Sequence, residues 1–277
     1  MLRKTIFLLL VLSPTLSHAG LFESEPELKC GNDNVIAAAK AWFYDESLSQ
    51  LQNSYIQTPE LFHGIPQNTY EQQLRAIPIQ FGDVTTLSLR TGMTQRNCTA
   101  KISAGIPQAT LDLLKILPES LNDITQGNGQ VLNNDVVWKE VKYEIQVADN
   151  GKDIIVNATQ DIKPLTTSIY NIATLAVAKD ALIRQKNDAD ISMAEQRFNR
   201  DDRELNIIWQ SLPDSSRAAL KKEQQVWVTQ KAQKCGKISD AKSEAVPAAQ
   251  RINIYQCQQR LTGERIAYLG GEDPEGD

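Results

Sequence analysis

The chain has 277 residues, of which 41% are hydrophobic and 23% charged, and its formal net charge at pH 7 is −5. This length is sufficient for two domains of ~100–200 residues each. An acidic balance of this kind argues against nucleic acid or an anionic membrane as the partner and favours a basic one.

Residues 1–19 have the pattern of a secretory signal peptide. A basic pair precedes an unbroken apolar run, 6–12, which is too short for the ~20 residues of a membrane-spanning helix. The small residues in 17–19 predict cleavage before Gly20. We therefore expect a periplasmic or secreted protein without a membrane span. Removal of the basic pair lowers its net charge from −5 to −7.

Residues 26–163 mix helical and strand patterns, which predicts an α+β domain. Apolar residues repeat at helical spacing in 33–52, at 69–75 and in 111–124, so each segment is expected to form a helix. Alternating apolar and polar residues predict antiparallel strands at 77–90, 97–106, 136–147 and 153–159. Asn150-Gly151 predicts the last hairpin turn, because both residues tolerate positive φ. A helix packed on about four strands resembles the cystatin-like and NTF2-like α+β domains.

Pro164 marks a boundary, and a connector helix is expected at 164–200. Apolar residues recur at helical spacing from 166 to 197, and the helix is expected to continue through the highly charged segment 197–204. These charged residues form either a solvated helix face or a docking surface.

Residues 201–270 carry the most specific pattern in the chain. It consists of Leu205-Asn206 and Leu212, Gln224 and Trp227, Cys235, Cys257, and Leu261-Thr262 followed by Arg265. This layout resembles the lysozyme inhibitor LprI-like domain, a family of bacterial envelope proteins that includes the YecT-like proteins. The resemblance implies a small all-α domain closed by a disulfide, and a function in blocking a lysozyme. The glycine-rich, acidic residues 271–277 are expected to form a disordered tail.

Three helical faces are expected to form the core of this domain. Leu205 and Trp209 share the first face, Trp227 lies on the second and Leu261 on the third, which predicts a small apolar core. Alternatively, Trp209, Trp227 or Tyr255 offers a stacking platform to a glycan.

All four cysteines lie in the exported part of the chain, where an oxidising compartment favours disulfides. Four cysteines allow three pairings. We expect Cys30–Cys98 and Cys235–Cys257, because each pair falls within one predicted domain. The chain has no Cys-x-x-Cys, and His63 is its single histidine after the signal peptide, so zinc-ligand spacing is absent and no metal or cofactor is expected.

Catalytic patterns are weak. His63 is the one histidine available to a Ser-His-Asp or Cys-His device, and the sequence has no Gly-x-Ser-x-Gly element or phosphate-binding glycine loop. A carboxylate pair for glycoside hydrolysis would have to come from Asp201, Asp202 and Glu204. These residues lie in a charged helical run, where solvated carboxylates are usual. We therefore predict a binding protein and not an enzyme.

The predicted function depends on a surface that binds a protein, and the family resemblance implies that this protein is a lysozyme. Blocking a lysozyme cleft requires a basic side chain near the two catalytic carboxylates, inside an acidic rim that attracts a cationic enzyme. Lys231, Lys234 and Lys237 surround Cys235 and are the candidate partner-binding residues. Two alternatives are an accessory or structural envelope protein that binds another envelope protein, and a peptidoglycan- or glycan-binding protein.

Overall fold

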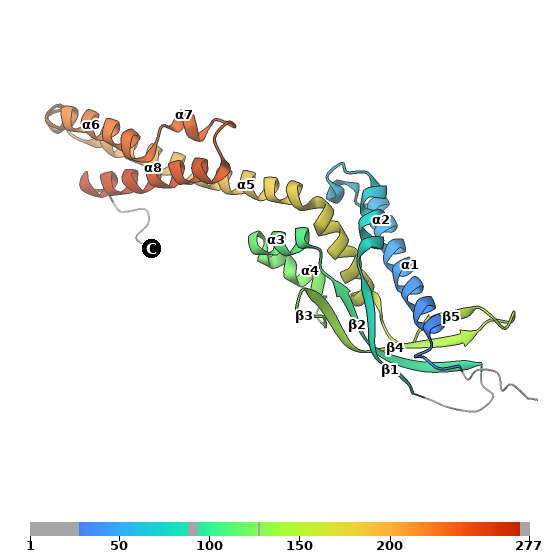
Figure 1. Cartoon of the computed structure of the whole chain (residues 1–277). Helices are drawn as coiled ribbons and strands as arrows, with labels where there is room; N and C mark the ends of the chain where they lie inside the picture. The colour runs from blue at the N-terminus through green and yellow to red at the C-terminus, as the bar shows by residue number, and fades with distance from the viewer. Residues whose placement is uncertain (1–27, 88–93, 127, 272–277) are drawn as a thin grey trace, which may run out of the picture.

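The structure is a computed structural model that describes residues 28–87, 94–126 and 128–271. The predicted signal peptide, and the predicted tail beyond Gly271, lie outside these residues. Figure 1 shows an α+β region (28–162), a long helix that leaves it, and a helical region (184–271) around the far half of that helix. The predicted fold class, an antiparallel sheet with helices followed by a disulfide-closed helical region, is confirmed.

The α+β region contains α1 (Asp33–Gln57), the 3-10 helix η1 (Pro59–Phe62), α2 (Gln67–Ala76), β1 (Ile79–Thr86), β2 (Gln95–Gly105), α3 (Gln108–Ile116), the 3-10 helix η2 (Pro118–Ser120), α4 (Leu121–Thr125), β3 (Gln130–Leu132), β4 (Asp135–Val147) and β5 (Ile154–Ala158). Four helices follow: α5 (Lys163–Ser211), α6 (Asp214–Cys235), α7 (Ile238–Ala241) and α8 (Ala248–Tyr268). Within the described part of the chain, no helix combines the length and the apolar character needed to cross a bilayer.

The prediction of a single helix at 111–124 is wrong, because the structure has two helices in this range. Pro118 separates α3 from α4 and begins the short η2 turn between them. Proline has no backbone N–H, and its ring clashes with the preceding turn of a helix, so the apolar spacing on both sides of Pro118 belongs to two helices.

The sheet is antiparallel throughout, with the strand order β1-β2-β4-β3 and with β5 also paired to β4. β2 runs along one edge of β4 over most of its length. β3 pairs with the start of β4 and β5 with its end, so these two short strands share the other edge.

A β-bulge interrupts β4 and changes which of its residues face the core. Ala100 and Ile102 of β2 lie opposite Val141 and Trp138, so two residues of β4 oppose one residue of β2 between them. On β2, alternate residues from Arg96 to Ala104 are buried, as the strand pattern predicts. On β4 the alternation shifts at the bulge, so Trp138 and Val141 are both buried.

The buried residues of α1 recur every four positions and therefore lie on one face of the helix, which packs on the sheet. They are Val35, Ala39, Phe43, Ser47 and Leu51. A disulfide joins Cys30, just before α1, to Cys98 in β2, which confirms the first predicted pairing. Cys30 and Cys98 are both fully buried in the core of the α+β region.

The 49-residue helix α5 takes part in two separate cores. Its first part packs against α1, α2, α3 and α4, and its last part packs against α8. Residues 179–190 between these parts are all described and none of them is buried. At ~1.5 Å per residue the path along the helix is about 74 Å, and Figure 1 shows that the helix bends as it leaves the α+β region. We refer to 179–190 as the neck.

Candidate functional site

The helical region is closed by the disulfide Cys235–Cys257, as predicted. It ties the last residue of α6 to the middle of α8, with the two Cα atoms 5.4 Å apart. Gly236 follows with φ +93°, and a Cβ at this position would lie 3.1 Å from Ile254. Glycine is therefore required for the chain to turn immediately after the disulfide.

The apolar core of the helical region is small. Its members are Ile191, Ala194, Phe198, Ala241, Ile254 and Tyr255. Of the four residues predicted to form the core, Leu205 and Leu261 are buried and Trp209 and Trp227 are half-buried, and none of the four belongs to this cluster. Tyr255 is 1% exposed, so its ring does not offer a platform to a glycan.

A layer of buried polar side chains fastens α6 to α8. Lys231 is the one buried residue of α6, and its Nζ donates a hydrogen bond to Thr262 Oγ1 at 3.0 Å. Arg265 donates from Nε to Gln224 Oε1 at 2.8 Å and from Nη1 to Glu223 Oε1 at 2.6 Å. Besides the disulfide Cys235–Cys257, hydrogen bonds and the ion pair of Arg265 with Glu223 therefore join the two helices.

Trp227 lies between the cations of this layer. The Nζ of Lys231 is 4.8 Å from the centre of the Trp227 ring, and the guanidinium carbon of Arg265 is 5.7 Å from it. Contacts of this kind are cation–π interactions, which are strongest at the face of tryptophan. Gln224, Trp227, Thr262 and Arg265, which carry the family resemblance, thus have a structural role in joining α6 to α8.

The three candidate partner-binding lysines differ in their exposure. Lys234 and Lys237 are exposed beside the disulfide. Lys231 is only 8% exposed, and the structure places its ammonium inside the helical region and not on its surface. Burial lowers the pKa of Lys231, and the carboxylate of Asp202, 3.9 Å away, opposes that shift.

The acidic residues considered for catalysis do not form an open pair. Asp201 is 1% exposed and accepts a hydrogen bond from Arg200 Nε at 2.7 Å, whereas Asp202 is partly exposed beside Lys231. His63 lies far from them in the sequence, in an exposed turn after η1 with φ +52°. Among the described residues, no group of three or more histidines, cysteines, aspartates or glutamates is placed to hold a metal ion.

Four exposed arginines line two adjoining hollows, one on the surface of α5 and one between α5 and α8. Two open hollows, of about 440 and 540 Å³, share Arg197, and the residues around them include Arg200, Arg203 and Arg260. No aspartate or glutamate is among the described residues that line these two hollows. We refer to the four side chains as the arginine groove. Its chemistry suits carboxylates, because guanidinium groups bind them through paired hydrogen bonds.

The comparison with known families identifies this part of the chain. Residues 184–269 match the family "Lysozyme inhibitor LprI". The family resemblance of the C-terminal part is therefore confirmed. The match begins at the neck, includes the whole arginine groove and both cysteines of the second disulfide, and leaves the α+β region outside.

No curated protein and no solved structure matches the chain. The likeness of the α+β region to cystatin-like or NTF2-like domains therefore stays a prediction.

The matched region differs in charge from the rest of the chain. Residues 184–269 contain 15 lysines and arginines and 11 aspartates and glutamates, a net charge of +4. The acidic excess that favoured a basic partner therefore lies outside the matched region. Sequence analysis missed the arginine groove, although Arg197, Arg200 and Arg203 recur every three residues and hence share one helix face. Arg260 joins them only through the packing of α8 on α5.

Proposed function

We propose that this protein is an exported, non-enzymatic binding protein that inhibits a lysozyme or another enzyme that cleaves peptidoglycan. The match of residues 184–269 to the family "Lysozyme inhibitor LprI" carries the proposal. Two disulfides give further support, because such bonds persist in oxidising compartments outside the cytoplasm.

We assign the enzyme-binding surface to the arginine groove. Most glycoside hydrolases use two carboxylates that flank the bond to be cleaved, and a planar guanidinium binds a carboxylate through two parallel hydrogen bonds. Arg197 and Arg203 are exposed and have no hydrogen-bond or ion-pair partner among the described residues, so their guanidinium groups are available. Because the helical region is itself basic, this contact depends on carboxylates in the cleft and not on the overall charge of the enzyme.

Lys234 and Lys237 are the second set of candidate contacts. Both are exposed near the end of α6, where the disulfide Cys235–Cys257 holds the chain in place. A positioned loop loses less conformational entropy on binding than a mobile one, which favours contacts at this place.

The test uses protein that begins at Gly20 with both disulfides intact. It is titrated into the lysis of cell walls by lysozymes of several classes, and direct binding is measured by calorimetry. We expect dose-dependent inhibition that is lost when Cys235–Cys257 is reduced. If no lysozyme binds, the proposal fails. Retention on peptidoglycan without enzyme inhibition would instead favour a glycan-binding protein.

A further inference from the structure

One edge of β4 has a gap between two short strands. β3 pairs with residues 135–137 of β4, and β5 pairs with residues 143–147. The five residues between them, 138–142, face no strand of the described chain on that edge. Unpaired backbone groups at a sheet edge are a template for another extended segment.

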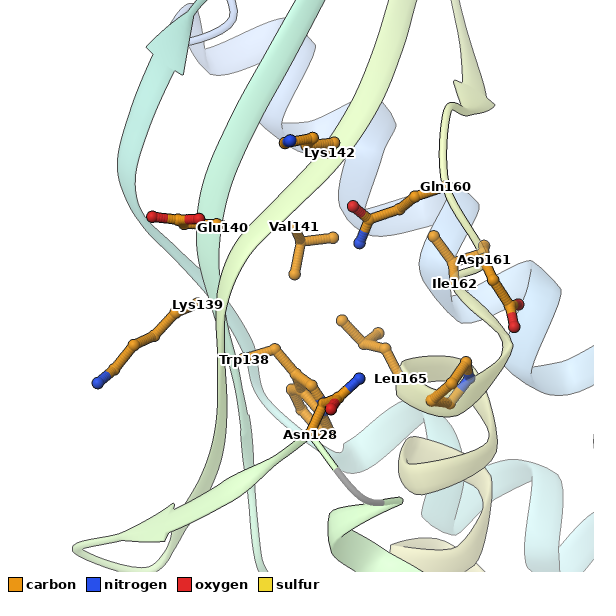
Figure 2. Close-up of a pocket in the computed structure, with 11 residues that line it drawn as sticks. Asn128, Trp138, Lys139, Glu140, Val141, Lys142, Gln160, Asp161, Ile162 and Leu165 are labelled. Atoms are coloured by element: carbon orange, nitrogen blue, oxygen red, sulfur yellow. The ribbon is translucent and has the colours of Figure 1, made fainter.

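A hollow of about 320 Å³ lies at this gap (Figure 2). Trp138, Val141 and Leu165, all buried, form its apolar floor. The side chain of Gln160, from the segment between β5 and α5, points from the opposite wall toward Val141, whereas Lys139 points away from the hollow.

The bulge in β4 produces this floor. Residues three apart on a regular strand point to opposite faces, but here Trp138 and Val141 are both buried against the hollow. Glu140 between them has φ +57°, a left-handed conformation that is unusual for a residue with a side chain. β-Bulges are frequent next to functional sites, where they redirect side chains.

Trp138 carries a hydrogen-bond donor without a partner just beneath the surface of this site. The residue is 4% exposed, and its indole N–H has no acceptor among the described residues. A Cβ on Gly129 would lie 3.1 Å from Cε2 of Trp138, the ring carbon bonded to the indole nitrogen. The donor therefore lies beside the turn at Asn128, which is one wall of the hollow. A buried N–H without a partner is unfavourable, and a ligand carbonyl would relieve this once the ring turns to expose the N–H.

The lining defines the chemistry of the ligand. The lining holds as many acidic as basic residues, and Lys139 and Glu140 point away from the space between Val141 and Leu165, which favours an uncharged ligand. The side-chain amides of Asn128 and Gln160 offer both donors and acceptors, as a peptide group does. The hollow, at about 320 Å³, is near the lower end of the ~300–1,000 Å³ range of small-molecule sites, so it can hold a peptide of only a few residues.

We propose that the gap between β3 and β5 binds a short, uncharged peptide segment in extended conformation. The segment adds to the free edge of β4, packs its apolar side chain on Val141 and Leu165, and accepts a hydrogen bond from the indole N–H of Trp138, whose ring turns toward the hollow to make it. This site is remote from the arginine groove in the sequence and does not depend on the proposed inhibition of lysozyme.

The test follows the indole N–H signals of the four tryptophans by NMR in ¹⁵N-labelled protein that begins at Gly20. The probe is acetyl-trialanine amide. We expect a saturable shift of the Trp138 signal, which is assigned from the variant Trp138→Phe, and no shift of the Trp42 signal. Trp138→Phe retains most of the ring but removes the donor, so binding measured by calorimetry should weaken about fivefold, the value of one ordinary hydrogen bond.

A blocking variant provides an independent check. Gln160→Trp fills the hollow from an exposed position and should abolish binding, whereas Asn157→Trp, on the exposed face of β5, should not. N-methylation of the peptide amides should also abolish binding. The proposal is overturned if the Trp138 signal does not respond to millimolar peptide, or if it responds only to N-acetylglucosamine.

Discussion

At the residue scale, the most unusual side chain is Lys231. Its ammonium lies between the rings of Phe198 and Trp227, at 5.4 and 4.8 Å, and it binds Thr262. Burial favours the neutral form of a lysine, which is why its pKa lies below the ordinary value of 10.5. The folded protein therefore holds this proton less tightly than the unfolded chain does.

Replacement of Lys231 by methionine tests this account. Thr262 remains hydrogen-bonded to the carbonyl of Gln258, and Asp202 is partly exposed, so Lys231→Met leaves no buried group unpaired. We expect urea unfolding at pH 7 to show equal or higher stability, by about 0–2 kcal/mol. Between the lowered pKa and 10.5 the unfolded chain binds more protons, so the wild-type protein should gain stability relative to the variant as the pH rises from 7 to 10. A stability difference that does not change with pH would contradict this.

The exposed arginines have the opposite character, because they contribute little to the fold. We expect the double variant Arg197→Glu and Arg203→Glu to keep its melting temperature and to lose at least tenfold in affinity for the inhibited lysozyme, since two favourable charge contacts become repulsive. Lys221→Glu and Lys222→Glu, on exposed positions of α6, change the net charge equally and serve as the control. Equal losses in both variants would assign the effect to overall charge and not to the groove.

At the element scale, β4 shows which features follow from local sequence patterns and which do not. Its span was predicted because alternation and the Asn150-Gly151 turn are local signals. The face that its first half turns to the core was not predicted. Regular alternation assigns Val137 and Val141 to one face, whereas the bulge at Glu140 depends on pairing with β2.

Both disulfides were predicted from their placement in separate regions. The arginine groove was missed because Arg260 and Arg197 are brought together only by helix packing.

Substitution at Glu140 measures the strain of the bulge. Glycine adopts φ near +57° without the Cβ penalty, whereas a β-branched residue adopts it least readily. We expect Glu140→Gly to be as stable as the wild type or up to about 1 kcal/mol more stable, and Glu140→Val to lose about 1–2 kcal/mol. Chemical denaturation of the three proteins provides the comparison. Equal stability of the glycine and valine variants would argue against a left-handed residue at this position.

At the scale of the whole molecule, the neck of α5 determines the shape. None of residues 179–190 is buried, and only Leu182 and Ile183 among them pack partly against the core of the α+β region, so the two regions are joined by a largely solvated stretch of helix (Figure 1). Such a helix has little tertiary packing to support it and relies mainly on its own hydrogen bonds and on pairs such as Lys186 with Asp190, 2.6 Å apart.

Small-angle X-ray scattering tests this shape. A compact chain of 277 residues has a radius of gyration of about 19 Å. Because α5 alone is about 74 Å long, we expect a clearly larger radius and an asymmetric distance distribution with a long tail. The variant Ala189→Pro, in the neck, should bend the helix and shorten the largest dimension. A compact profile for the wild-type protein would mean that the neck folds back.

The uninterrupted course of α5 makes the molecule a spacer of defined reach. The peptide site begins near Leu165 and the arginine groove near Arg197, so about 48 Å of helix separates them. A target with two matching epitopes could bind both sites at once, with an effective concentration set by the length and bend of the helix and not by a flexible linker. Removing a few residues from the helix would bring the two sites closer. It would also rotate one site relative to the other, because successive residues are rotated by about 100° about the helix axis. The avidity for such a target would then depend on how many residues are removed, because that number sets the rotation between the two sites.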